Sequence, residues 1–279
     1  MTKVLIVNNR DKRMEYIKKI LANKCQIIAI TDELKFFYEL QDEKTKYIIL
    51  PVRGVDNHQV INDTSIKFTD NYLQSARGKT IYTGLVNDEF LKKCEANNIR
   101  LVSYLNENIA IDNNYLTTEG IIEAIVNNSE RAIYKSKILI VGYGKLGQIA
   151  ANILKAMKAD ITISCRHKKD FLHAKINDYI VINHPQIIGV VDQFDFIINT
   201  IPFHILDHLV LQKINESKLL IIDVSSEPYG LDHMFAKDKG INTLLLPGIP
   251  GKKAPQTAGE IIGNFIYEDI FGGENNEGW

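Results

Sequence analysis

Three glycines stand at a spacing that suits the binding of a dinucleotide. They follow an apolar run at 137–141 and precede a helical pattern at 148–154. In such a strand–turn–helix unit the first glycine permits a tight turn, the second lets the backbone approach a pyrophosphate, and the third lets helix and strand pack closely. Free N–H groups at the helix N-terminus also favour an anion. We expect a nicotinamide dinucleotide here, and a glycine turn without a ligand is the weaker alternative. The turn consists of Gly142, Tyr143, Gly144, Lys145, Leu146 and Gly147.

The segment after the next expected strand is basic and has no carboxylate. It runs from Ser164 through Cys165, Arg166 and His167 to two lysines. An Asp or Glu there would accept hydrogen bonds from the ribose of NAD(H). Arg166 can instead pair with a 2′-phosphate as a planar fork, with Ser164, His167 or Lys168 assisting. The sequence therefore favours NADP(H) over NAD(H), while a solvated basic turn that tolerates either cofactor is the alternative.

A third turn, Asn199-Thr200-Ile201-Pro202, follows a later strand pattern. Loops at the carboxyl ends of parallel strands line the ligand crevice of this kind of sheet. We expect these four residues to form a wall of the cofactor site, and a plain strand-ending turn is the alternative.

Short apolar runs alternate with helical patterns along the chain, which predicts an α/β fold with parallel sheets. Residues 54–75 carry no clear pattern. Strands are expected at Val4–Val7, Ile27–Ile30, Tyr47–Leu50, Thr80–Thr83, Leu101–Val102, Ile138–Val141, Ile161–Ser164, Tyr179–Ile182, Phe196–Asn199, Leu219–Asp223 and Thr243–Leu246. Helices are expected at Met14–Ala22, Asp88–Ala96, Thr117–Tyr134 and Thr257–Ile270.

These elements predict two Rossmann-like domains. Residues 1–115 would form a flavodoxin-like or Rossmann-like domain, which the C-terminal helix 256–271 joins, and residues 116–255 would form the NAD(P)-binding domain. The helix at 117–134, capped by Thr117 or Thr118, would connect them. The polar, glycine-rich tail 272–279 is expected to be frayed.

Composition excludes several classes of function. The net charge of −1 offers no electrostatic attraction to nucleic acid or to an anionic membrane. No apolar segment is long enough to span a bilayer, and the short apolar run near the N-terminus suits a strand rather than a signal peptide. The three cysteines have no ligand-like spacing, so no disulfide or metal site is expected and a cytoplasmic location fits best.

Three further segments, together with the glycine loop and residues 199–202, resemble the family of dipicolinate synthase A subunits. They are Leu116-Thr-Thr-Glu-Gly120, Asp223-Val-Ser-Ser-Glu-Pro-Tyr-Gly-Leu-Asp232 and the segment 246–259, LPGIPGKKAPQTAG. The last is the most specific. The resemblance covers essentially the whole chain and is strongest from about residue 114 onward.

The resemblance implies an activity and its partners. The fold would be a two-domain, formate/glycerate-dehydrogenase-like arrangement. The enzyme would oxidise a dihydrodipicolinate-like ring to pyridine-2,6-dicarboxylate with NAD(P)+ during sporulation. A small dicarboxylate would be the substrate, a flavoprotein-like B subunit would be a partner, and the chain itself would form a homo-oligomer.

Several residues of these segments are candidates for the chemistry. Glu119 could be the general base, or else a carboxylate that the helix dipole favours near the helix start. Ser225 and Ser226 are expected to donate hydrogen bonds to a ligand, because no His–Asp pair is placed to activate them as nucleophiles. The loop 247–257 would contribute Pro247 and Gly248 to the cofactor. Substrate contacts are expected from Thr118, Glu119, Lys252 and Lys253.

The chain departs from the family pattern at three places. Leu116 stands where the family tends to have proline, residues 8–13 read NNRDKR in place of a Gly-Gly-Asp-x-Arg-Gln stretch, and Glu227 stands where it tends to have arginine. A dicarboxylate needs cations or N–H groups near it, and Lys252, Lys253 and Arg53 could supply them. Two alternatives therefore stay open: a dehydrogenase of another small carboxylate, or an NADP(H)-binding subunit that senses rather than catalyses. No histidine lies in 247–257, which counts against a D-2-hydroxyacid dehydrogenase.

Overall fold

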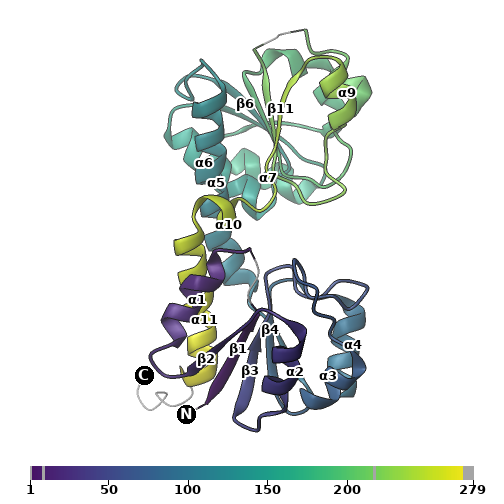
Figure 1. The fold of residues 1–279 in the computed structure, drawn as a ribbon. Coiled ribbons are helices and arrows are strands. Elements are labelled where there is room, and N and C mark those ends of the chain that lie inside the picture. The colour runs from purple at the N-terminus through teal and green to yellow at the C-terminus, as the bar shows by residue number, and fades with distance from the viewer. Residues whose placement is uncertain (1, 8–9, 216–217, 273–279) are drawn as a thin grey trace. The chain divides into compact units, whose positions relative to one another are not determined.

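The computed structural model describes residues 2–7, 10–215 and 218–272, and these form two compact α/β units. Unit 1 takes its residues from Met1–Asp112 and Ala254–Trp279, and unit 2 is Asn113–Lys253. Figure 1 shows a sheet flanked by helices in each unit. Residues 273–279 of the predicted tail 272–279, and residues 8–9 of the departing segment, lie outside the described residues.

Unit 1 is built on a five-stranded parallel sheet in the order β2-β1-β3-β4-β5. This is the strand order of flavodoxin-like folds. The interior strand β1 has its apolar residues fully buried, as expected for a parallel sheet with helices on both faces. The strands are β1 (Lys3–Val7), β2 (Gln26–Ile30), β3 (Thr45–Ile49), β4 (Thr80–Thr83) and β5 (Arg100–Ser103).

The C-terminal helix of unit 1 packs against its first helix, and Figure 1 shows the yellow α11 beside the purple α1. Two glycines make this packing possible. A Cβ on Gly259 would lie 2.7 Å from the Arg13 carbonyl oxygen, and one on Gly263 would lie 3.3 Å from Ile17 Cα. The absence of side chains therefore lets the two helices approach closely. The helices of this unit are α1 (Arg13–Leu21), α2 (Glu33–Gln41), α3 (Asp70–Ser75), α4 (Asp88–Ala96) and α11 (Pro255–Phe271).

Unit 2 contains a six-stranded parallel sheet in the order β11-β10-β9-β6-β7-β8. Read from β8 to β11, this is the doubly wound Rossmann order, and the strand order reverses between β6 and β9. Ligands bind outside the carboxyl ends of the strands at such a reversal. The strands are β6 (Lys137–Val141), β7 (Asp160–Ser164), β8 (Ile180–Ile182), β9 (Phe196–Asn199), β10 (Leu220–Asp223) and β11 (Asn242–Leu245).

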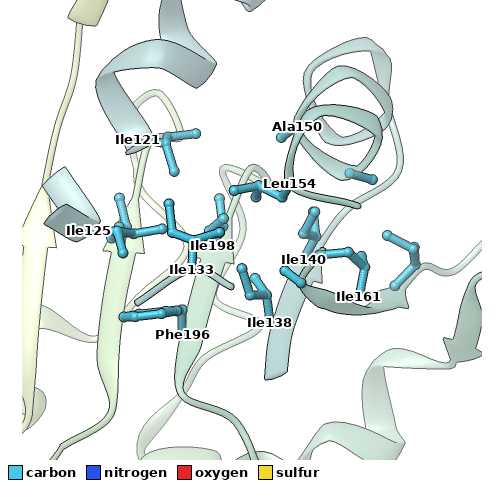
Figure 2. Packing of buried hydrophobic residues seen from close by; sticks show 14 of the residues in the cluster. Ile121, Ile125, Ile133, Ile138, Ile140, Ala150, Leu154, Ile161, Phe196 and Ile198 are labelled. Atoms are coloured by element: carbon cyan, nitrogen blue, oxygen red, sulfur yellow. The ribbon is translucent and has the colours of Figure 1, made fainter. Parts of the chain in front are cut away.

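Helices pack their apolar faces on this sheet. Figure 2 shows Ile121 and Ile125 of α5 and Leu154 of α6 gathered over Ile140 and Ile198 of the sheet. The glycine loop is thereby held between a buried strand and a helix with a buried face. The helical elements are α5 (Glu107–Asn128, which enters from unit 1), α6 (Lys145–Ala156), α7 (Lys168–Ile176), α8 (His208–Leu211), α9 (His233–Asp238), α10 (Ile249–Lys253) and two 3₁₀ helices, η1 (His184–Gly189) and η2 (Val191–Gln193).

The predicted α/β class with two parallel sheets is confirmed. The predicted bounds of the connecting helix were wrong. It runs over Glu107–Asn128 and not over Thr117–Tyr134. Asn106 caps it, because its Oδ1 accepts hydrogen bonds from the N–H groups of Asn108 and Ile109 at 3.0 and 3.1 Å. The expected caps Thr117 and Thr118 lie inside the helix instead.

The segment 247–257 was expected to be a loop and is largely helical. The helix α10 covers Ile249–Lys253, and α11 begins at Pro255. Proline suits the first turn of a helix because its missing N–H would have had no partner there. None of the described helices combines the length and the apolar character that crossing a membrane would need.

Candidate functional site

The loops that follow β6, β7 and β9 enclose a cleft of about 510 Å³ within unit 2. This volume lies in the range of small-molecule and cofactor sites. The cleft lies at the reversal of strand order, where the fold places ligands. Its lining consists of Asn114, residues 142–147, Cys165, Arg166, His167, Asp170, His184, Thr200, Ile201, Pro202, Phe203 and Ile205.

Each glycine of the loop has a different structural role. Gly142 has φ of +103°, and a Cβ there would collide with Thr200 Oγ1. A Cβ on Gly147 would collide with the carbonyl oxygen of Gly142, so this position needs glycine for helix and turn to pack. Gly144, in contrast, meets no other protein atom within 4 Å of its position for a Cβ. Its lack of a side chain leaves open space beside the backbone.

The helix α6 begins at this open space. Gly144 is its N-cap, no side chain caps it, and its first turn holds no acidic residue. The N–H groups of the first turn of a helix have no partner within the helix and carry partial positive charge. The geometry therefore suits a bound anion such as a pyrophosphate.

The second wall of the cleft is basic. Arg166 and His167 are exposed, and Arg166 Nη2 lies 3.3 Å from His167 Nε2. Asp170 of α7 faces the same cleft. Ser164 does not line it, because the residue is fully buried and its hydroxyl lies 2.7 Å from His184 Nδ1. The histidine, and not the serine, thus faces the ligand space.

Two other side chains of the cleft lining have altered acidity. Burial raises the pKa of the Cys165 thiol, and Asp170 adds to the increase. Burial also raises the pKa of Tyr143, although its contact with Asn177 acts in the opposite direction. Both groups are therefore neutral at physiological pH, and neither adds charge to the cleft.

The third wall is fixed to the sheet by hydrogen bonds. The hydroxyl of Thr200 donates to the carbonyl of Val141 at 2.9 Å, which joins the turn to β6. Asn199 is fully buried and does not line the cleft. Its Nδ2 donates to the Ile201 carbonyl at 3.0 Å and to Asp223 Oδ1 at 2.9 Å. Asn199 therefore shapes the wall, while Thr200, Ile201 and Pro202 form it.

Asp223 is the centre of a buried polar cluster at the end of β10. Ser225 donates to its Oδ1 from N–H and hydroxyl at 3.0 and 2.7 Å. Gly230 N–H donates to its Oδ2 at 3.1 Å, and His233 Nε2 lies 3.3 Å from the same oxygen. A His–Asp pair therefore lies near these serines, whereas the sequence predicted none placed to activate them. The pair still does not activate Ser225, because the serine hydroxyl bonds to the carboxylate and not to the imidazole.

The remaining candidates of unit 2 lie outside the cleft lining. Glu119 is exposed and lies in the interior of α5, so its expected place at the helix start was wrong. Thr118 is fully buried, and its hydroxyl donates to the Asn114 carbonyl at 2.8 Å. Lys253 pairs with Glu123 at 2.7 Å. The other candidates absent from the lining are Lys168, Ser225, Ser226, Pro247, Gly248 and Lys252.

Five residues of the lining were not predicted from the sequence. His184 and Asp170 follow β8 and β7, so the rule that loops at strand ends line the crevice could have identified them. Phe203 and Ile205 extend the predicted turn. Asn114 could not be predicted as a lining residue, because the helix that carries it was expected to begin only at Thr117. Within residues 2–7, 10–215 and 218–272, no group of three His, Cys, Asp or Glu side chains is placed to hold a metal ion.

Comparison with known proteins extends these observations. The family model of the acetohydroxy acid isomeroreductase NADPH-binding domain matches residues 132–222. The A subunit of dipicolinate synthase from Bacillus subtilis (strain 168) is 27% identical over 281 residues, covering 95% of this chain and 94% of that protein.

Solved structures share the fold. The dipicolinate synthase A subunit from Bacillus subtilis superposes with a TM-score of 0.85 at 26% identity, covering 99% of this chain and 98% of that one. Its counterpart from Bacillus halodurans gives 0.83 at 24%, covering 96% and 97%. A 2-hydroxyacid dehydrogenase from Ketogulonicigenium vulgare Y25 gives 0.63 at 13%, covering 98% and 96%, and so shares the fold alone. The chain is thus similar in sequence and in fold to the A subunit of dipicolinate synthase over nearly its whole length, as its motifs indicated.

Proposed function

We propose that this chain is an NAD(P)-dependent oxidoreductase that binds its cofactor in the cleft of unit 2. The observation that carries the proposal is the meeting of three loops around one space of about 510 Å³. The glycine loop leaves room at Gly144 for a pyrophosphate, and α6 directs its N-terminus to the same place. The similarity of residues 132–222 to an NADPH-binding domain supports this choice of ligand.

We further propose NADP(H) as the preferred form. Arg166 lies beyond the end of β7, where NAD-specific proteins carry an acidic residue that binds the ribose. Its guanidinium can form two parallel hydrogen bonds with a 2′-phosphate. His167 lies beside it in the same lining and adds a second nitrogen donor.

The proposed reaction is the oxidation of a dihydrodipicolinate-like ring to pyridine-2,6-dicarboxylate. The ring loses a hydride and a proton and becomes aromatic, and the bound nicotinamide would accept the hydride at C4. The similarity to the A subunit of dipicolinate synthase over 95% of the chain supports this choice of substrate. Glu119, Ser225 and Ser226, with Thr118, Lys252 and Lys253, stay the proposed catalytic and substrate-binding residues, and Pro247 and Gly248 stay proposed cofactor contacts.

A second candidate function rests on Glu227. This exposed carboxylate stands where the resemblance led us to expect arginine, and it accepts a hydrogen bond of 3.0 Å from the Tyr229 hydroxyl. A carboxylate repels an anionic substrate. The alternatives are therefore a dehydrogenase of another small carboxylate and an NADP(H)-binding subunit without turnover.

Turnover separates these functions. The purified full chain would be mixed with NADP+ or NAD+ and freshly prepared hydroxy-tetrahydrodipicolinate, with and without a dipicolinate synthase B subunit. Formation of NADPH together with the ultraviolet absorbance of the pyridine product is the expected result. Cofactor binding without turnover would favour the sensing function, and reduction of the cofactor only by other small carboxylates would favour the other dehydrogenase.

The name of the relative also motivates proposed partners. A protein that is named as one subunit of a synthase implies a second one, so we propose that this chain binds a flavoprotein-like B subunit. We also propose that the chain forms a homo-oligomer. Size-exclusion chromatography with light scattering, of the chain by itself and with the B subunit, would measure both. A monomeric mass that the B subunit does not change would contradict these assignments.

A further inference from the structure

His184 lies at the same edge of the sheet as the basic turn. The parallel strands β7 and β8 place Ser164 opposite Ile182, and the Cys165 N–H donates to the Ile182 carbonyl at 3.2 Å. The loops that leave these two strand ends therefore start side by side. Arg166 and His184, which these loops carry, both line the cleft.

The orientation of the His184 ring is fixed from two directions. Its Nδ1 lies 2.7 Å from the hydroxyl of the fully buried Ser164. His184 is also the first residue of η1, whose start is held by a reciprocal capping box between Asn183 and Gln186. Because Nδ1 is engaged by the serine, Nε2 is the ring nitrogen that can meet a ligand. A histidine held in this way has lost much of its rotamer freedom before any ligand binds.

The charges around this ring come from two elements. The loop after β7 brings Arg166 and His167, and α7 brings Asp170 to the same lining. Burial lowers the pKa of His184, and electrostatic repulsion from Arg166 and His167 lowers it further. The imidazole is therefore neutral at physiological pH while the cleft holds no anion.

We propose that His184 is a ligand of the 2′-phosphate of NADP(H), acting together with Arg166, and that it takes up a proton when this phosphate binds. The inference rests on the proposed function, since it assigns a specificity residue within the proposed cofactor cleft. The chemical class recognised is a ribose 2′-phosphomonoester. The proton comes from solvent, and the bond formed is a charge-assisted hydrogen bond from Nε2–H to a phosphate oxygen.

The proton uptake has a definite direction. A dianionic phosphate near the ring stabilises the imidazolium, so the pKa of His184 rises on binding. Affinity for a 2′-phosphorylated nucleotide should therefore increase as the pH falls from 8.5 towards about 7, close to the ordinary pKa of histidine. A phosphomonoester itself titrates near pH 6, and working above about pH 7 keeps that second effect small. NAD(H) has no 2′-phosphate and should show no such dependence.

A comparison of two nucleotides tests the contact between His184 and the 2′-phosphate. Adenosine 2′,5′-bisphosphate carries the 2′-phosphate, while adenosine 5′-monophosphate lacks it and is otherwise the same. Isothermal titration calorimetry of the full chain at pH 7.2, in two buffers of different ionisation enthalpy, measures both affinity and proton uptake. We expect uptake of a fraction of one proton with the bisphosphate and none with the monophosphate.

The variants are His184→Gln and a matched control, His58→Gln. His58 is an exposed histidine of unit 1 outside the cleft. His184→Gln should lose the proton uptake and bind the bisphosphate roughly tenfold more weakly, as expected for one charge-assisted hydrogen bond. It should leave binding of the monophosphate unchanged. The control should behave as the wild type with both nucleotides.

A measurement on the wild type guards against a variant that folds poorly. The ¹⁵N resonances of the His184 ring should shift to those of an imidazolium when the bisphosphate is added at pH 7.2. Uptake that persists in His184→Gln, or a ring that stays neutral with the bisphosphate bound, would overturn the inference and leave the cofactor site intact. Failure of both nucleotides and of both dinucleotides to bind would overturn the proposed function itself.

Discussion

The side chain of Asn199 donates a hydrogen bond of 2.9 Å to the buried carboxylate of Asp223, joining the ends of β9 and β10. The same amide holds the Ile201 carbonyl at 3.0 Å, so one side chain links the polar cluster to a wall of the cleft. A buried carboxylate needs such donors, because an unpaired buried charge is costly. Asn199 therefore connects the stability of unit 2 to the shape of its site.

We predict that Asn199→Ala destabilises the protein and also weakens cofactor binding. Removal of one donor from the buried carboxylate should lower the free energy of unfolding by about 1–3 kcal/mol. The freed turn at residues 200–202 should reduce dinucleotide affinity. Urea unfolding and calorimetry measure the two effects, with the exposed Asn127→Ala of α5 as the control. Full stability with unchanged affinity would show that Asn199 has no such role.

Gly144 offers a test of the cleft that avoids damage to the fold. Its φ is −71°, which other residues adopt, and no protein atom lies within 4 Å of its Cβ position. Gly144→Val should therefore fold, while its side chain fills the space assigned to the pyrophosphate. We predict a loss of dinucleotide affinity of more than about tenfold, a free-energy change of about 1.4 kcal/mol, with little change in thermal unfolding.

A matched control exists in the same unit. Gly189, at the end of η1, likewise meets no atom within 4 Å, has no left-handed φ, and lies outside the cleft. Gly189→Val should bind the dinucleotide like the wild type in fluorescence titrations. Equal binding by both variants would place the cofactor elsewhere.

Strands were the most predictable part of this fold. The continuous apolar runs of β1 and β6 arise because parallel strands are buried on both faces, and that requirement is visible in the sequence. The start of α5 was not visible. Its first turns carry many polar residues, and the signal that begins the helix is one side-chain cap at Asn106. An asparagine is equally common in turns, so the pattern alone could not locate it.

The candidate site also has one part that the sequence predicted and one part that it did not. The glycine loop was predictable because Gly142 and Gly147 are needed for the turn and its packing, Gly144 leaves room for a ligand, and the three stand at a fixed spacing. The roles of Ser164 and Asn199 were not, since both were expected at the ligand and both are buried. Their partners, His184 and Asp223, lie 20 and 24 positions away in sequence. Only the pairing of neighbouring strands brings them together, and a single sequence does not reveal such distant pairs.

Arg166 should decide the choice of cofactor. We predict that Arg166→Ala weakens NADP+ binding by about tenfold or more, because charge-assisted hydrogen bonds to one phosphate contribute roughly 1.5–3 kcal/mol. Binding of NAD+ should stay the same. Arg166→Lys keeps the charge but loses the planar fork, so it should recover only part of the affinity. Calorimetry with both cofactors measures the difference.

The control for this prediction is Lys169→Ala. Lys169 is an exposed cation of the same segment that does not line the cleft, so it reports the general loss of positive charge. A similar loss in both variants would mean that the field of the segment, and not a specific contact, attracts NADP+. Equal affinities for the two cofactors, unchanged in Arg166→Ala, would contradict the assignment of NADP(H).

Asp269 of α11 should make the stability of unit 1 depend on pH. Arg100 forms two hydrogen bonds of 2.8 Å with this carboxylate, and the Tyr82 hydroxyl donates a third at 2.6 Å. The pKa of Asp269 is lowered, chiefly by Arg100 and also by Tyr82, although burial acts in the opposite direction. A lowered folded-state pKa adds stability above the ordinary value near 3.8, and that stability disappears as the pH falls through the folded-state pKa.

Asp269→Asn should therefore cost stability at neutral pH and cost progressively less in acid. Because Arg100 is more than half exposed, solvent screening limits the effect, and we expect a loss of about 1–2 kcal/mol at pH 7. Urea unfolding of wild type and variant between pH 7 and pH 3 measures the difference. Asp238→Asn, at an exposed carboxylate of α9, should change little at any pH. If the difference between Asp269→Asn and wild type stayed constant down to pH 3, the ionised carboxylate would not be the source of the stabilisation.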